Sequence, residues 1–201
     1  MIKHRLKLGI LASRNGSSFR AIVAAIAAGQ LAAEVRLLVA NTGAAGALGF
    51  ARTRGLSTSV IPTQADPEGA DLRLSEALAE AEVELVILSG YLRRIGPQTQ
   101  ARFPRRILNI HPGPLPRFGG EGMYGRRVHQ TVIASGVSES AVTIHLVEGD
   151  YDRGPVLSRW TVPIDPGETA ESLEARVTAL EPKLFVQTLQ EIAAGDLILP
   201  P

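Results

Sequence analysis

Residues 106–116 read Arg-Ile-Leu-Asn-Ile-His-Pro-Gly-Pro-Leu-Pro, and this stretch decides how the rest of the chain is interpreted. Its first part, residues 107–110, is a short apolar run typical of a buried strand. The three prolines that follow cannot continue a strand, because proline lacks a backbone N–H and has a fixed φ. Asn109 and His111 therefore fall where a strand becomes a rigid loop. Two residues apart in an extended chain, they project to the same side.

The neighbouring segments alternate between apolar runs and helical patterns. Alternation of this kind predicts right-handed βαβ units and a mostly parallel sheet. We expect strands over residues 6–12, 35–40, 58–61, 83–88, 107–110, 141–147 and 156–164. Helices are expected over residues 19–26, 44–54, 72–81, 98–103 and 125–134, and from the segment 166–169 to about Ala193.

The predicted fold class is thus α/β, with a twisted, Rossmann-like sheet covered by helices on both faces. The last two strands are expected to form a hairpin and give the sheet an antiparallel C-terminal edge. No repeat, low-complexity segment or linker divides residues 1–201, so one domain is predicted. Open sheets of this class bind ligands beyond the carboxyl ends of their strands, which is where Asn109 and His111 are expected.

The composition excludes several classes of function. A formal charge of +1 with scattered basic residues gives no sign of a nucleic-acid surface. The chain has no cysteine, and its four histidines lack the tight spacing of metal ligands, so we expect no metal. No apolar run reaches the ~20 residues of a membrane span, and the first six residues are too charged for a signal peptide. A cytoplasmic protein is predicted.

A small-residue turn, Ser13-Arg14-Asn15-Gly16-Ser17-Ser18, follows the first predicted strand. Ser17 or Ser18 is a natural N-cap for the helix that comes next. The free N–H groups of such a helix start, together with its dipole, suit a phosphate. The turn matches neither the Walker pattern nor the three-glycine dinucleotide pattern. A phosphate site and a purely structural turn both remain open at this point.

An acidic turn supplies a third group, because Asp150 and Asp152 lie between the last two predicted strands. A side-chain amide can donate to an oxyanion, and a carboxylate beside a histidine favours imidazolium and fixes its tautomer. The Gly-x-Ser-x-Gly pattern is absent, so the nucleophile of an acyl transfer would be the substrate's own amine or water. The alternative is a capping Asn109, a packed His111 and a solvated turn. His145, inside a predicted strand, is interpreted as a core or supporting group.

These residues carry a resemblance. Asn109-Ile110-His111-Pro112, then Leu115-Pro116, then Asp152-x-Gly154-Pro155 resemble the folate-dependent formyltransferase superfamily. The turn Ser13–Ser17 narrows the resemblance to members that formylate 5-phosphoribosylglycinamide. Similarity extends from Leu6 to about Glu191.

The resemblance implies transfer of the formyl group from 10-formyltetrahydrofolate, a co-substrate, to the substrate amine by direct attack, in purine biosynthesis, without a metal. It implies His111 as general acid and base, Asn109 on the formyl oxygen, and Asp152 keeping His111 protonated. The implied contacts of the phosphoribosylglycinamide are Gly16, Ser17 and Ser18 for its phosphate, and Thr178, Ala179, Leu180 and Glu181 for the rest. The implied folate-binding residues are Leu92, Arg93, Arg94, Ile95, Asn109, Glu148, Gly149, Asp150, Tyr151 and Asp152.

The sequence departs from the commoner family pattern in three places. An arginine that contacts folate in many members is missing where residues 66–69 stand, and Arg93 or Arg94 is the expected substitute. The loop of residues 118–125 resembles a glycine-rich subgroup, and Ser18 replaces an asparagine.

Three alternatives compete with the transferase. A 10-formyltetrahydrofolate hydrolase would use water in place of the amine, and we expect such a protein to carry an added N-terminal domain. A methionyl-tRNA formyltransferase is expected to add a C-terminal nucleic-acid-binding domain. A catalytically silent nucleotide- or folate-binding module would make the site residues coincidental. The expected partners are small molecules, with no nucleic acid or membrane, and the chain is expected to be a monomer or homodimer.

Overall fold

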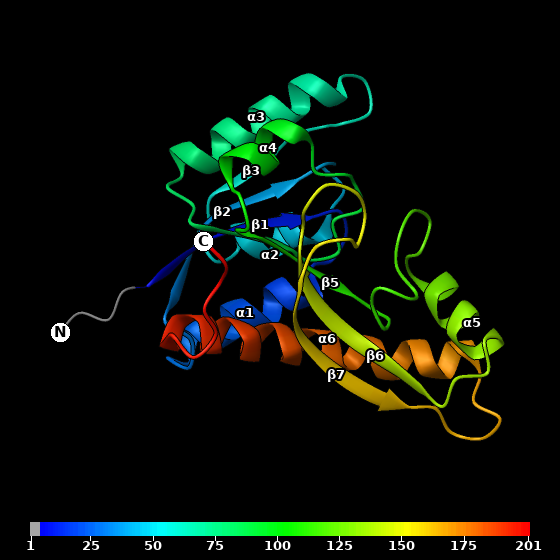
Figure 1. Ribbon diagram of the computed structural model, residues 1–201. Helices are drawn as coiled ribbons and strands as arrows, with labels where there is room; N and C mark the ends of the chain where they lie inside the picture. Colours follow the sequence, from blue (N-terminus) through cyan, green and yellow to red (C-terminus); the bar gives the residue numbers. More distant parts are fainter. Residues whose placement is uncertain (1–4) are drawn as a thin grey trace.

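The computed structural model describes residues 5–201, which form seven strands and six helices (Figure 1). The strands are β1 (Leu6–Ala12), β2 (Ala33–Ala40), β3 (Thr58–Val60), β4 (Leu85–Leu88), β5 (Ile107–His111), β6 (Glu139–Leu146) and β7 (Val156–Pro163). The helices are α1 (Ser17–Ala27), α2 (Gly46–Arg52), α3 (Pro67–Glu80), α4 (Pro97–Arg102), α5 (Arg126–Ala134) and α6 (Ala170–Ala194). Residues 1–4, part of the charged start on which the signal-peptide prediction rested, lie outside the described range.

Over the described residues, the strands form one sheet in the order β3-β2-β1-β4-β5-β6-β7. Strands β1 to β5 pair in parallel, whereas β5 with β6 and β6 with β7 pair antiparallel. The predicted α/β class, the mostly parallel sheet and the antiparallel C-terminal edge are therefore confirmed. The strand order reverses between β1 and β4, and such a switch point is where open sheets place their ligands.

Helices cover both faces of the sheet. Apolar side chains of α1, α2, α5 and α6 pack on one face. Those of α3, with Ile95 and Phe103 at the two ends of α4, pack on the other (Figure 1). Strand β4 is apolar throughout because both of its faces are buried. Leu85 and Ile87 belong to the first core, and Val86 and Leu88 belong to the second. A strand buried on both faces has no polar position to spare. No helix within residues 5–201 is both long and apolar enough to cross a bilayer.

Helix α3 begins earlier than predicted. The helix was expected to start at Leu72, but α3 starts at Pro67. The Asp66 side chain caps it by accepting from the Gly69 N–H at 2.9 Å, and proline suits the first helical position, where no N–H is needed. The apolar spacing used for the prediction becomes regular only after this capped first turn.

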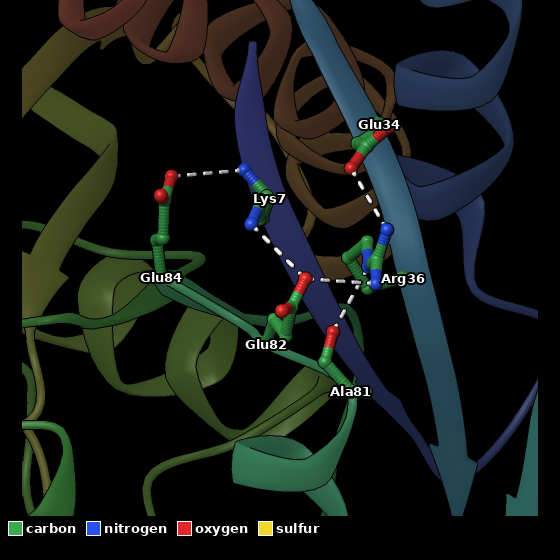
Figure 2. Close-up of polar contacts among 6 residues, drawn as sticks. All are labelled: Lys7, Glu34, Arg36, Ala81, Glu82 and Glu84. Atoms are coloured by element: carbon green, nitrogen blue, oxygen red, sulfur yellow. Dashed lines mark hydrogen bonds and ion pairs between the residues drawn. The ribbon is translucent and has the colours of Figure 1, made fainter. Parts of the chain in front are cut away.

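A network of charged side chains lies at the opposite end of the sheet from the predicted site (Figure 2). Glu82, in the turn between α3 and β4, pairs with Lys7 and Arg36 at 3.1 Å each. Arg36 also donates to the carbonyl of Ala81 at 2.9 Å and pairs with Glu34 at 3.2 Å. These contacts join β1 and β2 to the start of β4, mostly at exposed positions.

Candidate active site

Four polar side chains from three segments meet beside β5. Asp152 lies between two histidines, with one carboxylate oxygen 3.3 Å from His111 Nδ1 and the other 3.3 Å from His145 Nε2. Asn109 Nδ2 lies 3.0 Å from the same His145 nitrogen. Strand pairing explains part of this, because Asn109 faces His145 across β5 and β6. The predicted partnership of Asn109, His111 and Asp152 is thus brought together in space, and His145 completes it.

His111 lies between opposing influences. Its Nε2 is 2.8 Å from the Phe118 carbonyl oxygen, and its Nδ1 faces Asp152, so both ring nitrogens meet acceptors. Protonation of both nitrogens would satisfy both contacts. Burial acts in the other direction and dominates, so the pKa of His111 is lowered, although the Asp152 charge and the Phe118 carbonyl raise it. The expectation that Asp152 keeps His111 protonated is corrected here: a resting ring with a lowered pKa is better suited to accept a proton.

Asp152 holds its charge in an enclosed position. Its side chain is 8% exposed, and burial works to raise its pKa, yet the net pKa is lowered. The hydrogen bond with His145, the His111 ring and the N–H of Gly120, which donates at 3.0 Å, together outweigh burial. The backbone of Asp152 has φ 56°, a left-handed value that non-glycine residues adopt at a cost.

His145 orients Asn109. Its Nδ1 lies 2.8 Å from the Leu146 carbonyl oxygen, which fixes the proton on that nitrogen in the neutral ring. With the proton on Nδ1, the neutral ring accepts from the Asn109 NH₂ group through Nε2. The 3.3 Å contact of Nε2 with Asp152 becomes a hydrogen bond only when both ring nitrogens are protonated. The second N–H of that NH₂ group remains for a ligand. The interpretation of His145 as a supporting group rather than a catalyst fits this contact.

The glycine-rich loop, residues 118–125, closes the site. Its backbone supplies the Phe118 carbonyl to His111 and the Gly120 N–H to Asp152. Gly119 allows the close approach, since a Cβ there would lie 2.8 Å from the Cβ of Asp152. The sequence analysis missed these two backbone contacts. Four glycines in the loop were the available signal, but a backbone group that points at a site has no residue type of its own.

The turn after β1 leaves donors open at the start of α1. The N-cap is Gly16, at φ 63°, and not Ser17 or Ser18 as predicted, and no side chain caps the helix end. The N–H of Phe19 is instead bound by Ser89 Oγ at 3.0 Å, which removes the need for a serine cap. Within residues 5–201, the N–H groups of Gly16, Ser17 and Ser18 have no protein acceptor.

The same turn is tied to the loop after β4. Ser13 N–H donates to the Gly90 carbonyl at 3.2 Å, and Ser13 Oγ accepts from the Leu92 N–H at 2.8 Å. Together with the bond from Phe19 to Ser89, these contacts fix the loops of β1 and β4 against each other at the switch point. A ligand held by one loop is therefore positioned relative to the other.

A pocket of about 60 Å³ opens beside the four-residue cluster. Most of the predicted folate-binding residues line it, namely Arg93, Arg94, Ile95, Asn109, Gly149, Asp150, Tyr151 and Asp152. Two do not: Leu92 is 45% exposed and its N–H donates to Ser13 Oγ, and Glu148 pairs with Arg105 at 3.2 Å. Among the described residues that line the pocket there is no serine, threonine or lysine.

The two candidate arginines differ in their partners. Arg94 already pairs with Asp150 at 2.6 Å. Arg93 Nε is buried and lacks a hydrogen-bond partner among residues 5–201. Both arginines also line a larger adjoining cavity that reaches α3 at Pro67 and Leu72. Asp66, where the family arginine is missing, caps α3 and pairs with Arg73 at 3.1 Å.

The predicted residues 178–181 lie on α6. Thr178 and Ala179 are exposed, and Leu180 and Glu181 are half-buried. Pro182, the next residue, lines a groove together with Ala21 of α1, so this part of α6 runs beside the helix that starts at Gly16. Burial raises the pKa of Glu181 to about 7. Over the described residues, no cluster of histidine and acidic side chains is arranged to hold a metal ion.

Comparison with known proteins establishes the family. The formyl transferase family matches residues 6–189, so this chain belongs to the formyl transferases. It is 40% identical over 196 residues to the chloroplastic phosphoribosylglycinamide formyltransferase of Vigna unguiculata, covering 96% of this chain and 63% of that protein. The crystal structure of glycinamide ribonucleotide transformylase 1 from Symbiobacterium toebii matches with a TM-score of 0.88 at 29% identity, over 98% of this chain and 92% of that one. The sequence-based resemblance is confirmed at the level of the family.

Two facts limit what these matches say about activity. The chain spans 63 to 65% of the length of three chloroplastic relatives. A formyltetrahydrofolate deformylase from Pseudomonas syringae also shares the fold, with a TM-score of 0.87 at 17% identity, over 99% of this chain and 65% of that one. The fold is therefore common to a transferase and a deformylase, and the site has to distinguish them.

Proposed function

We propose that this protein is a phosphoribosylglycinamide formyltransferase of purine biosynthesis. It moves the formyl group of 10-formyltetrahydrofolate to the amine of 5-phosphoribosylglycinamide and releases tetrahydrofolate. The observation that carries the proposal is the cluster of Asn109, His111 and Asp152 beside a pocket. The part of the chain that the structure describes puts no serine, threonine or lysine nucleophile in the lining of this pocket. The amine of a second substrate fills that chemical role. The acting unit is the single domain of residues 1–201, as a monomer or homodimer in the cytoplasm.

The reaction follows from the contacts of the site. The amine attacks the formyl carbon, and the free N–H of Asn109 donates to the oxygen on which negative charge develops. The amine proton passes to His111, whose lowered pKa makes the neutral ring available as a base. The imidazolium then lies 3.3 Å from the Asp152 carboxylate, which stabilises it. His111 returns the proton to the nitrogen of the folate as the carbon–nitrogen bond breaks.

The loop of residues 118–125 takes part in this cycle. His111 Nε2 faces the Phe118 carbonyl, while Nδ1 faces Asp152. Proton exchange through Nε2 therefore requires that a substrate group replaces the Phe118 carbonyl. The run of glycines lets the loop withdraw without a large conformational penalty.

The second substrate, 5-phosphoribosylglycinamide, is bound through its phosphate. The open N–H groups of Gly16, Ser17 and Ser18, at the positive end of α1, bind the phosphate. Thr178, Ala179, Leu180 and Glu181, on α6 beside α1, contact the rest of the molecule. The ties between the β1 and β4 loops support this arrangement, because they hold the turn at Gly16 in a fixed position relative to the loop after β4.

The folate is held between two loops. Residues 93–95 and 149–152, which line the pocket, surround its bicyclic ring. Arg93, whose Nε has no partner among the described residues, anchors the acidic tail in place of the missing family arginine. Arg94 is less suited because its guanidinium is already paired with Asp150.

A spectrophotometric assay with 10-formyltetrahydrofolate, with and without 5-phosphoribosylglycinamide, tests the proposal. Folate turnover that depends on the amine is expected. The alternative function is a 10-formyltetrahydrofolate hydrolase, since a deformylase has the same fold, and turnover without the amine would establish it. Absence of turnover with both substrates present would indicate a silent binding module.

A further inference from the structure

The Gln100 side chain joins two loops that are far apart in the sequence. Gln100 lies on α4 and is half-buried. Its Nε2 donates to the Ile95 carbonyl at 2.8 Å and to the Gly149 carbonyl at 3.3 Å. Its Oε1 accepts from the Gly149 N–H at 2.8 Å. Both ends of the amide are therefore hydrogen-bonded. They join the loop of Ile95 to the loop of Gly149.

The helix that carries Gln100 is itself anchored. Asp71 of α3 accepts from the N–H of Gln98 at 2.8 Å, and from the N–H and hydroxyl of Thr99 at 3.2 and 2.6 Å. Asp71 and Thr99 are 8% and 0% exposed. Gly96 lies against this contact, since a Cβ there would fall 2.3 Å from the Asp71 carboxylate. Gln100 therefore extends from a helix whose start is held in place by the hydrogen bonds to Asp71.

The loop of residues 148–152 depends on this contact for its position. At one end of the loop, Asp152 is held by His111, His145 and the Gly120 N–H. Over residues 148–150 the side-chain contacts are the ion pairs of Arg94 with Asp150 and of Arg105 with Glu148, both exposed, and exposed pairs fix a loop weakly. Gly149 has φ 66° and Asp152 has φ 56°, so two left-handed residues bracket the loop. Three residues span at most about 11 Å. Where Gly149 is held therefore restricts where Asp152 can meet His111.

We propose that Gln100 is a positioning residue for the reaction. It sets the separation of the two loops that form the walls of the folate pocket, and it places Asp152 through Gly149. This role rests on the proposed function, since it assigns the pocket between the loops to the folate. The amide is required because one group must donate to two carbonyls and accept from an N–H. Glutamate would lack the donors, and asparagine would be about 1.5 Å too short.

The test compares Gln100→Leu, Gln100→Glu and the control Gln187→Leu, which makes the same change at an exposed position on α6. For Gln100→Leu we expect the KM for 10-formyltetrahydrofolate to rise at least tenfold, while the KM for 5-phosphoribosylglycinamide changes less than twofold. The value of kcat should fall several-fold because Asp152 is less well placed. Gln100→Glu, which keeps the acceptor, should give an intermediate effect, and Gln187→Leu should match the wild type.

Hydrogen exchange separates positioning from general destabilisation. The Gly149 amide should exchange at least tenfold faster in Gln100→Leu, with protection in β1 and β4 unchanged. An unchanged KM for the folate, equal rises in both KM values, or unchanged exchange at Gly149 would overturn the proposal. Wild-type protein without amine-dependent turnover would instead overturn the proposed function, and the exchange at Gly149 would still decide whether Gln100 holds the loop.

Discussion

Glu82 and Asp152 are two acids in nearly the same backbone conformation, and each lies between two nitrogen-bearing side chains. Their φ values are 54° and 56°. Glu82 pairs with Lys7 and Arg36, and its side chain is 62% exposed. Asp152 pairs with His111 and His145 and is 8% exposed. The two acids therefore share a backbone conformation and a bridging position, but only Glu82 is exposed to solvent.

Solvent decides what each acid can do. In water, Glu82 meets permanently charged partners whose attraction is screened, so the contact fastens strands together at little net gain. Away from water, Asp152 lies beside two imidazole rings, and its charge favours the protonated form of His111 by raising that pKa against the effect of burial. The pKa of both acids is lowered, but for Asp152 this happens against the effect of burial. A bridging acid is a structural tie at one place and part of proton chemistry at the other.

Replacing Asp152 with asparagine should have the largest effect. The asparagine side chain is close to isosteric with aspartate, so the fold should persist, but His111 loses the charge that raises its pKa. We expect kcat to fall by about 10³-fold, the order of a lost acid–base partner, measured by steady-state kinetics. The titration of His111 should move to lower pH, as followed by NMR.

Near-normal turnover of Asp152→Asn would show that Asp152 takes no part in the proton chemistry. The proposed difference between Asp152 and Glu82 would then be wrong. An unchanged His111 titration with a lowered kcat would instead assign Asp152 to holding the loop through Gly120. Thermal unfolding serves as the control that the variant is folded.

Sequence patterns predicted the framework because burial repeats along the chain. The apolar run of β4 reflects burial on both faces of the strand. The end of β5 after His111 reflects the missing N–H of proline. The same reasoning placed Asn109 and His111 together, since period-two geometry is local as well. The role of Asp152 came from the family resemblance, which carries long-range information that spacing lacks.

What the sequence left open depends on contacts between distant segments. The pairing of Asn109 with His145 follows from the register of β5 against β6, and no local pattern fixes that register. The N-cap was misassigned because Ser89, at the end of another strand, already satisfies Phe19. The lowered pKa of His111 follows from burial by a loop, which composition does not reveal.

His145→Leu should have the second-largest effect. It removes the acceptor that orients the Asn109 amide while leaving Asn109 in place. We expect kcat to fall roughly 10-fold to 100-fold, less than when an oxyanion donor is lost outright, with the KM for folate little changed. Steady-state kinetics with both substrates measures this. A loss as large as that of Asp152→Asn would show that His145 exchanges protons itself.

Glu181 lies between the two cases, because it is half-buried and the shift of its pKa comes from burial. Its pKa of about 7 exceeds the ordinary value of 4.5. The protonated form is therefore favoured in the folded state, so this stability is complete below pH 4.5 and is lost as pH rises through 7. Glu181→Gln should remove the loss and raise the free energy of unfolding by ~2 kcal/mol at about pH 8, with little change at pH 4.5. Denaturant unfolding at both pH values measures this, and an equal change at both would contradict the raised pKa.

Glu82→Gln should have the smallest effect. The lowered pKa of Glu82 stabilises the fold above the ordinary value of 4.5, and this contribution is lost as pH falls through the folded value. The melting temperature should therefore drop slightly at neutral pH and low salt, and the difference from wild type should vanish in high salt or acid. Turnover should be unchanged, as it should be for the matched control Glu80→Gln at the exposed end of α3.

A lowered kcat in Glu82→Gln alone would break the comparison. Glu82 ties β1, which leads into the turn at Gly16, to the start of β4, which pairs with the strand that carries Asn109. Lost turnover without lost stability would therefore mean that the charged network transmits strain along the sheet to the site. Solvent exposure would then not explain why Asp152 acts in the reaction and Glu82 does not.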